Sequence, residues 1–173
     1  MEGTERLAGL TPWMHLKVRQ ILRAADRSGI LVVRIASGRR SCAEQNAAYA
    51  QGRDDEGPIV TEVRGCGSWH VWGRAVDLVL DGPASAYEAL GAEWERMGGI
   101  WGGRFSFGDL GHLEWHPDIP HISALCPDQS ACPDPSTPWR DDRPLLERPG
   151  IQALGGVALA VGGFALARSL VTR

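Results

Sequence analysis

The sequence lacks several features that would place it in a common functional class. Its 18 basic and 21 acidic residues give a net charge of −3, and they are mixed along the chain, so we expect no nucleic-acid partner. None of its four cysteines forms a CxxC pair, which argues against a structural zinc knuckle. The N-terminus, MEGTERLAGL, has no apolar stretch typical of a secretory signal, and we therefore expect synthesis in the cytoplasm without a signal peptide.

The four cysteines are Cys42, Cys66, Cys126 and Cys132. Cys126 and Cys132 are close enough in sequence to close a small disulfide loop, although free thiols in a reducing cytoplasm are at least as consistent with their spacing. No residue near Cys42 or Cys66 pairs either thiol with a base, so we interpret both as inert thiols. Neither these cysteines nor any serine forms a recognisable nucleophile arrangement.

Local patterns predict alternating helices and strands in the first two thirds of the chain. Thr11 as N-cap and Pro12 in the first turn predict a helix, which Gly29 ends. Residues 30–35 are short, apolar and β-branched, which is typical of a buried strand. Ser41 and Glu44 form a capping-box pattern that opens a helix to about residue 51.

The second half of this region continues the alternation. Residues 59–63 are a short extended piece in a glycine-rich loop, and residues 74–80 alternate as a strand does. A second capping-box pattern, Ser85 with Glu88, predicts a helix, and a last strand is expected over about residues 110–116. The short links between strands favour a small antiparallel sheet flanked by helices, so the fold class is α+β.

The composition changes after this region, which predicts three parts. Residues 1–125 form the folded domain, and residues 126–150, which contain six prolines, form a stiff linker. Residues 151–171 are apolar and predict a C-terminal hydrophobic helix, which we interpret as a membrane anchor. The alternative is a helix buried against a partner, because the segment is short and glycine-rich.

Two short segments contain the residues of a catalytic metal site. SWHVWGRAVD holds His70 and Asp77, and DLGHLEWH holds Asp109 and His112. Zinc binds imidazole nitrogen and carboxylate oxygen, and catalytic zinc has an open position for water. Gly73 lies between His70 and Asp77 and can supply the turn that brings both side chains to one side. Asp109 is then a nearby carboxylate that can accept a proton from water.

These motifs resemble the zinc D-alanyl-D-alanine carboxypeptidase family, and in particular its L-alanyl-D-glutamate endopeptidase branch of phage endolysins and bacterial wall hydrolases. The similarity runs from about residue 10 to residue 116 and includes ASGRRSCAEQNAAYAQGR, GPIVTEVRG, SWHVWGRAVD, WGGRFSFGD and HLEW. The resemblance implies Zn²⁺ as cofactor. It implies His70, Asp77 and His112 as zinc ligands, Asp109 and Arg40 as catalytic residues, and Ser68 and Gln45 as residues near the substrate.

The function that the resemblance implies is hydrolysis of the L-Ala–D-Glu bond in the stem peptide of peptidoglycan. We expect action on the cell wall or periplasm, with inner-membrane anchoring or association with a virion. Two alternatives are a D-Ala-D-Ala carboxypeptidase of the same family and a non-catalytic zinc-binding wall or virion module. The presence of Asp109 and Arg40 beside the three ligands argues against the non-catalytic module.

Two further residues allow a different register for the site. Glu114 as base and His116 as ligand form an ExH spacing, which fits the ExxH-type arrangement of carboxypeptidase relatives less well than Asp109 and His112 fit the endopeptidase branch. We therefore prefer Asp109 and His112, and we interpret His116 as a surface or strand-end residue. Three tryptophans are candidates for lining a cleft, although packing in the core is the simpler interpretation for each: Trp69, Trp72 and Trp101.

Overall fold

A computed structural model describes residues 1–128, and the fold of this part is α+β, as predicted. Its helices are α1 (Pro12–Arg27), α2 (Cys42–Ala50) and α3 (Ala84–Arg96), with short 3-10 helices η1 (Thr4–Leu7), η2 (Gly65–Gly67), η3 (Gly102–Arg104) and η4 (Ile122–Ala124). Its strands are β1 (Leu31–Ser37), β2 (Ala75–Asp81), β3 (Ile100–Trp101) and β4 (His112–Glu114). Within residues 1–128 no helix is both long and apolar enough to cross a membrane. The predicted hydrophobic helix at 151–171 lies outside the described residues.

Helix α1 forms as its sequence predicts. The Thr11 side chain accepts a hydrogen bond from the Met14 amide, Pro12 occupies the first turn, and Gly29 follows the helix at φ 69°. Three of its residues, Met14, Val18 and Ile21, are fully buried. The helix therefore presents one apolar face to the sheet, because these positions recur at intervals of three and four residues.

The four strands form one antiparallel sheet in the order β1-β2-β4-β3. Strand β2 is central, and its pairings place Ser37 of β1 and His112 of β4 on either side of Asp77. The extended piece predicted at residues 59–63 is not a strand. The last strand is shorter than predicted, and β3 was not predicted, because a two-residue strand is too short to show alternation.

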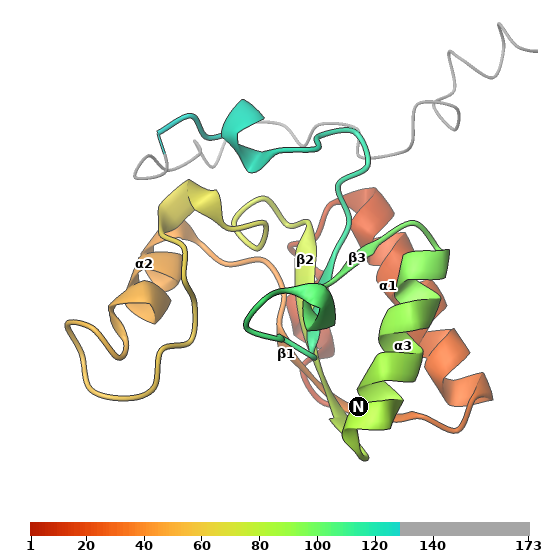
Figure 1. Ribbon diagram of the computed structural model, residues 1–173. Coiled ribbons are helices and arrows are strands. Elements are labelled where there is room, and N and C mark those ends of the chain that lie inside the picture. The colour runs from red at the N-terminus through yellow and green to blue at the C-terminus, as the bar shows by residue number, and fades with distance from the viewer. Residues whose placement is uncertain (129–173) are drawn as a thin grey trace, which may run out of the picture. The chain divides into compact units, whose positions relative to one another are not determined.

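Helices α1 and α3 pack side by side against the sheet, and α2 lies on the other side of the strands (Figure 1). The main core lies between the sheet and helices α1 and α3, where Trp94 of α3 and Trp115 meet edge to face at 6.0 Å. A smaller cluster of Trp69, Ala75 and Ile119 lies apart from it. Most of the apolar burial is thus on the α1–α3 side.

The start of α3 differs from the prediction. Its N-cap is Pro83, no side chain caps the helix, and Ser85 with Glu88 forms no capping box. The helix begins at Ala84, so Ser85 already lies inside the first turn, where its hydroxyl cannot occupy the N-cap position. The capping box of α2 is confirmed, because Ser41 accepts from the Glu44 amide and Glu44 accepts from the Ser41 amide.

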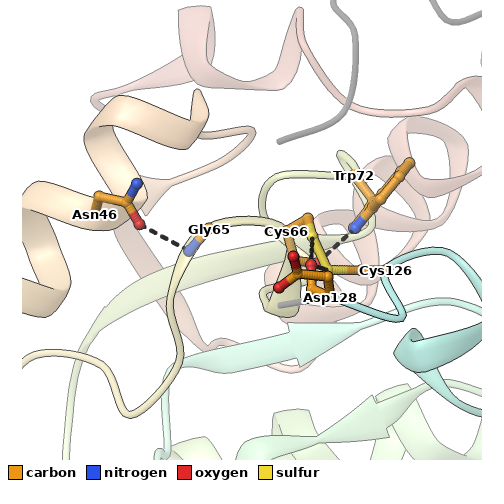
Figure 2. The surroundings of a disulfide bond; sticks show 6 residues. All are labelled: Asn46, Gly65, Cys66, Trp72, Cys126 and Asp128. Atoms are coloured by element: carbon orange, nitrogen blue, oxygen red, sulfur yellow. Dashed lines mark hydrogen bonds between the residues drawn. A yellow bond between two sulfur atoms is a disulfide. The ribbon is translucent and has the colours of Figure 1, made fainter. Parts of the chain in front are cut away.

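A disulfide joins Cys66 and Cys126, which are 60 residues apart in sequence, with a Cα–Cα distance of 5.8 Å. Neither alternative for Cys126, a loop to Cys132 or a free thiol, is therefore correct. The interpretation of Cys42 and Cys66 as inert thiols is also wrong, because Cys42 is disulfide-bonded as well. Figure 2 shows that Trp72 Nε1 donates to the Cys66 carbonyl (2.8 Å) and the Gly65 amide to Asn46 Oδ1 (3.0 Å). The disulfide thus joins the η2 segment to the chain that follows the sheet.

Candidate metal centre

The three predicted ligands meet at one place, although they come from different elements. Asp77 of β2 and His112 of β4 are directly opposite each other in the sheet. His70 precedes β2 and is returned toward Asp77 by a turn at Gly73, whose φ of 65° favours glycine, as the sequence predicts. The three candidate ligand atoms lie within 4.8 Å of one another.

Hydrogen bonds orient both imidazoles. His70 Nδ1 lies 2.7 Å from the Gly38 carbonyl oxygen, to which it must donate, and its Nε2 lies 3.2 Å from Asp77 Oδ1. His112 is turned the other way: its Nδ1 lies 2.8 Å from Asp77 Oδ1 and its Nε2 lies 2.9 Å from Glu114 Oε1. One nitrogen of each ring is therefore held by the protein, and the other faces the shared site.

Charges in this cluster are strongly coupled. Burial opposes the charge on Asp77, but His70 and His112 outweigh it and hold the pKa of Asp77 far below its usual range. Burial also opposes the charge on His112, yet bonds to Asp77 and Glu114 raise its pKa to about 10. Burial raises the pKa of Glu114 as well, but hydrogen bonds from His112 and His116 outweigh it and lower that pKa to about 2. Without a metal, the carboxylates of Asp77 and Glu114 thus favour the protonated form of His112.

Arg40 contacts the second oxygen of the candidate ligand Asp77. Its Nη2 lies 2.9 Å from Asp77 Oδ2, its Nε donates to Ser37 Oγ and its Nη1 donates to Gln45 Oε1. Gln45 is fully buried and donates to Thr61 Oγ1 and the carbonyl of residue 63. Arg40 is consequently fixed in a position that leaves Asp77 Oδ1 facing the two histidines.

The site opens into a cavity of about 570 Å³. Asp109 lines it together with Ser68, and the exposed side chains of Ile59, Val60 and Phe107 form its apolar walls. Partial desolvation, followed by the nearby charge of Asp77, raises the pKa of the Asp109 carboxyl. The cavity thus combines one candidate proton acceptor with apolar surface, as small-molecule and peptide sites commonly do.

A relative supports the motif assignment. Peptidoglycan L-alanyl-D-glutamate endopeptidase CwlK from Bacillus subtilis (strain 168) is 36% identical over 126 residues, in a match that covers 63% of this chain and 75% of CwlK. The chain belongs to this endopeptidase family. No family model matches the chain.

Two solved structures of peptidases are also similar to the chain. Serratia marcescens L-Ala D-Glu endopeptidase ChiX matches with 24% identity and a TM-score of 0.44, covering 66% of this chain and 89% of ChiX. The E175A mutant of the vancomycin resistance D,D-pentapeptidase VanY from the VanB-type cassette, solved in complex with Zn(II), matches with 18% identity and a TM-score of 0.44, covering 61% of this chain and 71% of VanY.

The structure also shows the surroundings of His116 and of the candidate cleft tryptophans in this endopeptidase-family chain. His116 is buried, stacks on Trp69 at 3.8 Å and contacts Glu114 and the Ile119 carbonyl, so the interpretation as a surface residue is wrong. Among the tryptophans, Trp69 lines the cavity, whereas Trp101 packs in the main core and donates to the Leu110 carbonyl.

The contacts of Glu114 were not predicted from the sequence. Its carboxylate bridges His112 Nε2 and His116 Nε2, at 2.9 and 3.0 Å. The available signal was the spacing of two residues from His112, which places both side chains on one face of β4.

Proposed function

We propose that this chain is a zinc-dependent peptidase that hydrolyses the L-Ala–D-Glu bond of peptidoglycan stem peptides. The observation that carries the proposal is the convergence of His70, Asp77 and His112 at a cavity that also contains Asp109. The choice of this bond rests on membership in the family of CwlK, which is named as a peptidoglycan L-alanyl-D-glutamate endopeptidase.

The donor set fits zinc. Two imidazole nitrogens and one carboxylate oxygen are a usual set for catalytic zinc, and both imidazoles are oriented by acceptors on their far nitrogens, Gly38 for His70 and Glu114 for His112. When bound, zinc would supply a Lewis acid and a lowered pKa for water. In the proposed reaction Asp109 takes the proton from the attacking water and gives it to the leaving amine.

Arg40 is proposed to have two roles. Its contact with Asp77 Oδ2 positions the ligand, and it lines the cavity, where a guanidinium N–H can stabilise charge on the substrate carbonyl oxygen. Ser68 is proposed to contact substrate from the cavity wall, and Gln45 to act indirectly by holding Arg40.

We further propose that the protein acts on the cell wall, outside the reducing cytoplasm. The Cys66–Cys126 disulfide supports this, because disulfides persist mainly in oxidising compartments. The division into a peptidase domain (1–125), a linker (126–150) and an apolar anchor (151–171) also stays a proposal, as does an endolysin or virion role.

The test is digestion of purified muropeptides followed by mass analysis of the products. We expect cleavage between L-Ala and D-Glu, and a loss of at least about 100-fold in rate for Asp109→Ala with zinc content unchanged. Release of terminal D-Ala with the L-Ala–D-Glu bond intact would instead support a carboxypeptidase. Full wall-lytic activity of the Asp109→Ala variant would contradict the proposed role of Asp109 as a catalytic residue.

A further inference from the structure

A chain of buried polar contacts leads away from the metal centre on the side of His112 opposite Asp77. Glu114 Oε1 contacts His112 Nε2 at 2.9 Å, and Glu114 Oε2 contacts His116 Nε2 at 3.0 Å. His116 Nδ1 lies 3.0 Å from the Ile119 carbonyl oxygen. The Glu114 and His116 side chains are only 12% and 6% exposed, so water competes little for these contacts.

The position of Glu114 determines which nitrogen of His112 carries hydrogen. A neutral imidazole has one N–H, and the nitrogen that binds a metal must lack it. His112 Nδ1 is the nitrogen that faces Asp77, so Nε2 must keep the hydrogen and donate it to Glu114. A carboxylate at this place therefore selects the tautomer that binds metal and holds the ring plane.

Glu114 is itself held by His116. Because the Ile119 carbonyl can only accept, His116 Nδ1 carries a hydrogen and the ring orientation is determined, with Nε2 at Glu114 Oε2. The carboxylate can also only accept, so His116 holds Glu114 when Nε2 carries a hydrogen too. The Trp69 ring lies almost parallel to the His116 ring, with an interplanar angle of 8°, and Trp69 directly precedes His70. The contacts thus connect the segments that contain two different ligands.

We propose that Glu114 and His116 are positioning residues for the metal centre: Glu114 fixes the tautomer and orientation of His112, and His116, stacked on Trp69, fixes Glu114. This inference rests on the proposed zinc site. It assigns to this pair an effect on metal affinity, and it leaves the proton transfer to Asp109.

The experiment measures zinc affinity of the full chain by competition with a chromogenic chelator, without substrate. We expect Glu114→Ala to weaken zinc binding by about 10–100-fold, the range for removing a partner of a ligand histidine. Glu114→Gln keeps an amide oxygen for His112 Nε2, so we expect partial recovery. His116→Phe preserves the aromatic stack but removes both hydrogen bonds, and we expect a loss of about 10-fold.

Matched controls are Glu88→Gln and His121→Gln, which change exposed residues of the same types. A Co²⁺-loaded sample supplies a second signal, since a changed His112 orientation alters the visible absorption bands, whereas a general loss of stability does not. If Glu114→Ala does not fold, His116→Phe decides the question.

The outcomes separate the two proposals. Wild-type protein that binds no zinc would contradict the proposed function. Wild-type protein that binds zinc, with Glu114→Ala or His116→Phe binding it as tightly and with unchanged Co²⁺ spectra, would overturn this inference alone.

Discussion

Two regions of the described fold are held together in different ways. The sheet with α1 and α3 encloses the main apolar core, where residues such as Met14, Ile21 and Trp94 are fully buried. The region on the other side of the strands, here called the loop region and defined as residues 38–73 with 116–128, has only the smaller apolar cluster around Trp69 and Ile119. Helix α2 within it has one buried residue, the polar Gln45. The loop region depends instead on hydrogen bonds and the Cys66–Cys126 disulfide.

The candidate ligands are divided between these regions. Asp77 and His112 are neighbours in paired strands, whereas His70 is in the loop region and is oriented by the Gly38 carbonyl. Ligands on a sheet keep their separation through backbone pairing, but His70 keeps its place only while the loop region stays closed. The comparison therefore predicts that damage to the core removes the whole site and that damage to the loop region removes mainly His70.

The largest expected effect is on the core. Trp94 is fully buried, and its Nε1 donates to the carbonyls of Ile100 and Glu114, which belong to β3 and β4. We expect Trp94→Ala to lower the free energy of unfolding by about 3–5 kcal/mol and to abolish zinc binding with it. Denaturant unfolding measures the first quantity. Trp94→Phe, which retains more of the ring volume, is the control, and an equal loss in both variants would argue against the cavity as the cause.

A smaller and more local effect is expected from the disulfide. Replacing Cys66 and Cys126 with serine removes a constraint across 60 residues, and we expect a loss of about 2–4 kcal/mol. Hydrogen exchange should show the loop region opening first, with protection of β1 and β2 retained and zinc affinity reduced. Uniform loss of protection across both regions would contradict the comparison.

The comparison also explains what could be predicted from the sequence. Local signals predicted helix α1 with its N-cap Thr11, strand β2 with Asp77, and the turn at Gly73. The structure confirms all three. The meeting of His70, Asp77 and His112 followed from the motif resemblance, and the structure places them together. Their catalytic and metal-binding roles stay predictions.

The features that were missed depend on contacts between distant segments. Connectivity among four cysteines has three possibilities, and spacing alone could not distinguish free thiols or a short Cys126–Cys132 loop from the Cys66–Cys126 disulfide. The contact of Arg40 with Asp77 joins residues 37 apart in sequence, and no local pattern indicates it. In the loop region, where few apolar residues constrain the packing, sequence periodicity is correspondingly uninformative.

A third prediction concerns the pH dependence of stability and the ligand candidate His112, which lies on strand β4. In metal-free protein the pKa of His112 is raised from 6.5 to about 10, so its stabilising contribution is complete below pH 6.5 and is lost as pH rises through about 10. We expect the Tm of chelator-treated protein to fall by several degrees over this window. In zinc-loaded protein His112 is already neutral, so the fall should be much smaller. His112→Gln should flatten the metal-free curve, and an unchanged curve would show that another group titrates.

The smallest effect on stability is expected at the cavity wall of the loop region. Ile59 and Val60 are 52% and 50% exposed, and they line the cavity together with the candidate site residues. Because they are largely in contact with water already, replacing both with serine should change the free energy of unfolding by less than about 0.5 kcal/mol each. The same change removes apolar surface that a bound peptide would cover, so KM for muropeptides should rise several-fold with kcat nearly constant.

The control for the cavity wall is the double substitution Leu31→Ser with Val33→Ser, which makes the same kind of change at exposed apolar residues of β1. These side chains are 57% and 37% exposed, and neither lines the cavity. Those substitutions should leave KM unchanged. If they raise KM as much as the changes at Ile59 and Val60, the apolar wall has no special contact with substrate. If the wall variants lower kcat instead, the loop region acts on the reacting groups as well as on binding, and the hydrogen bonds from Thr61 through Gln45 to Arg40 are one route for that effect.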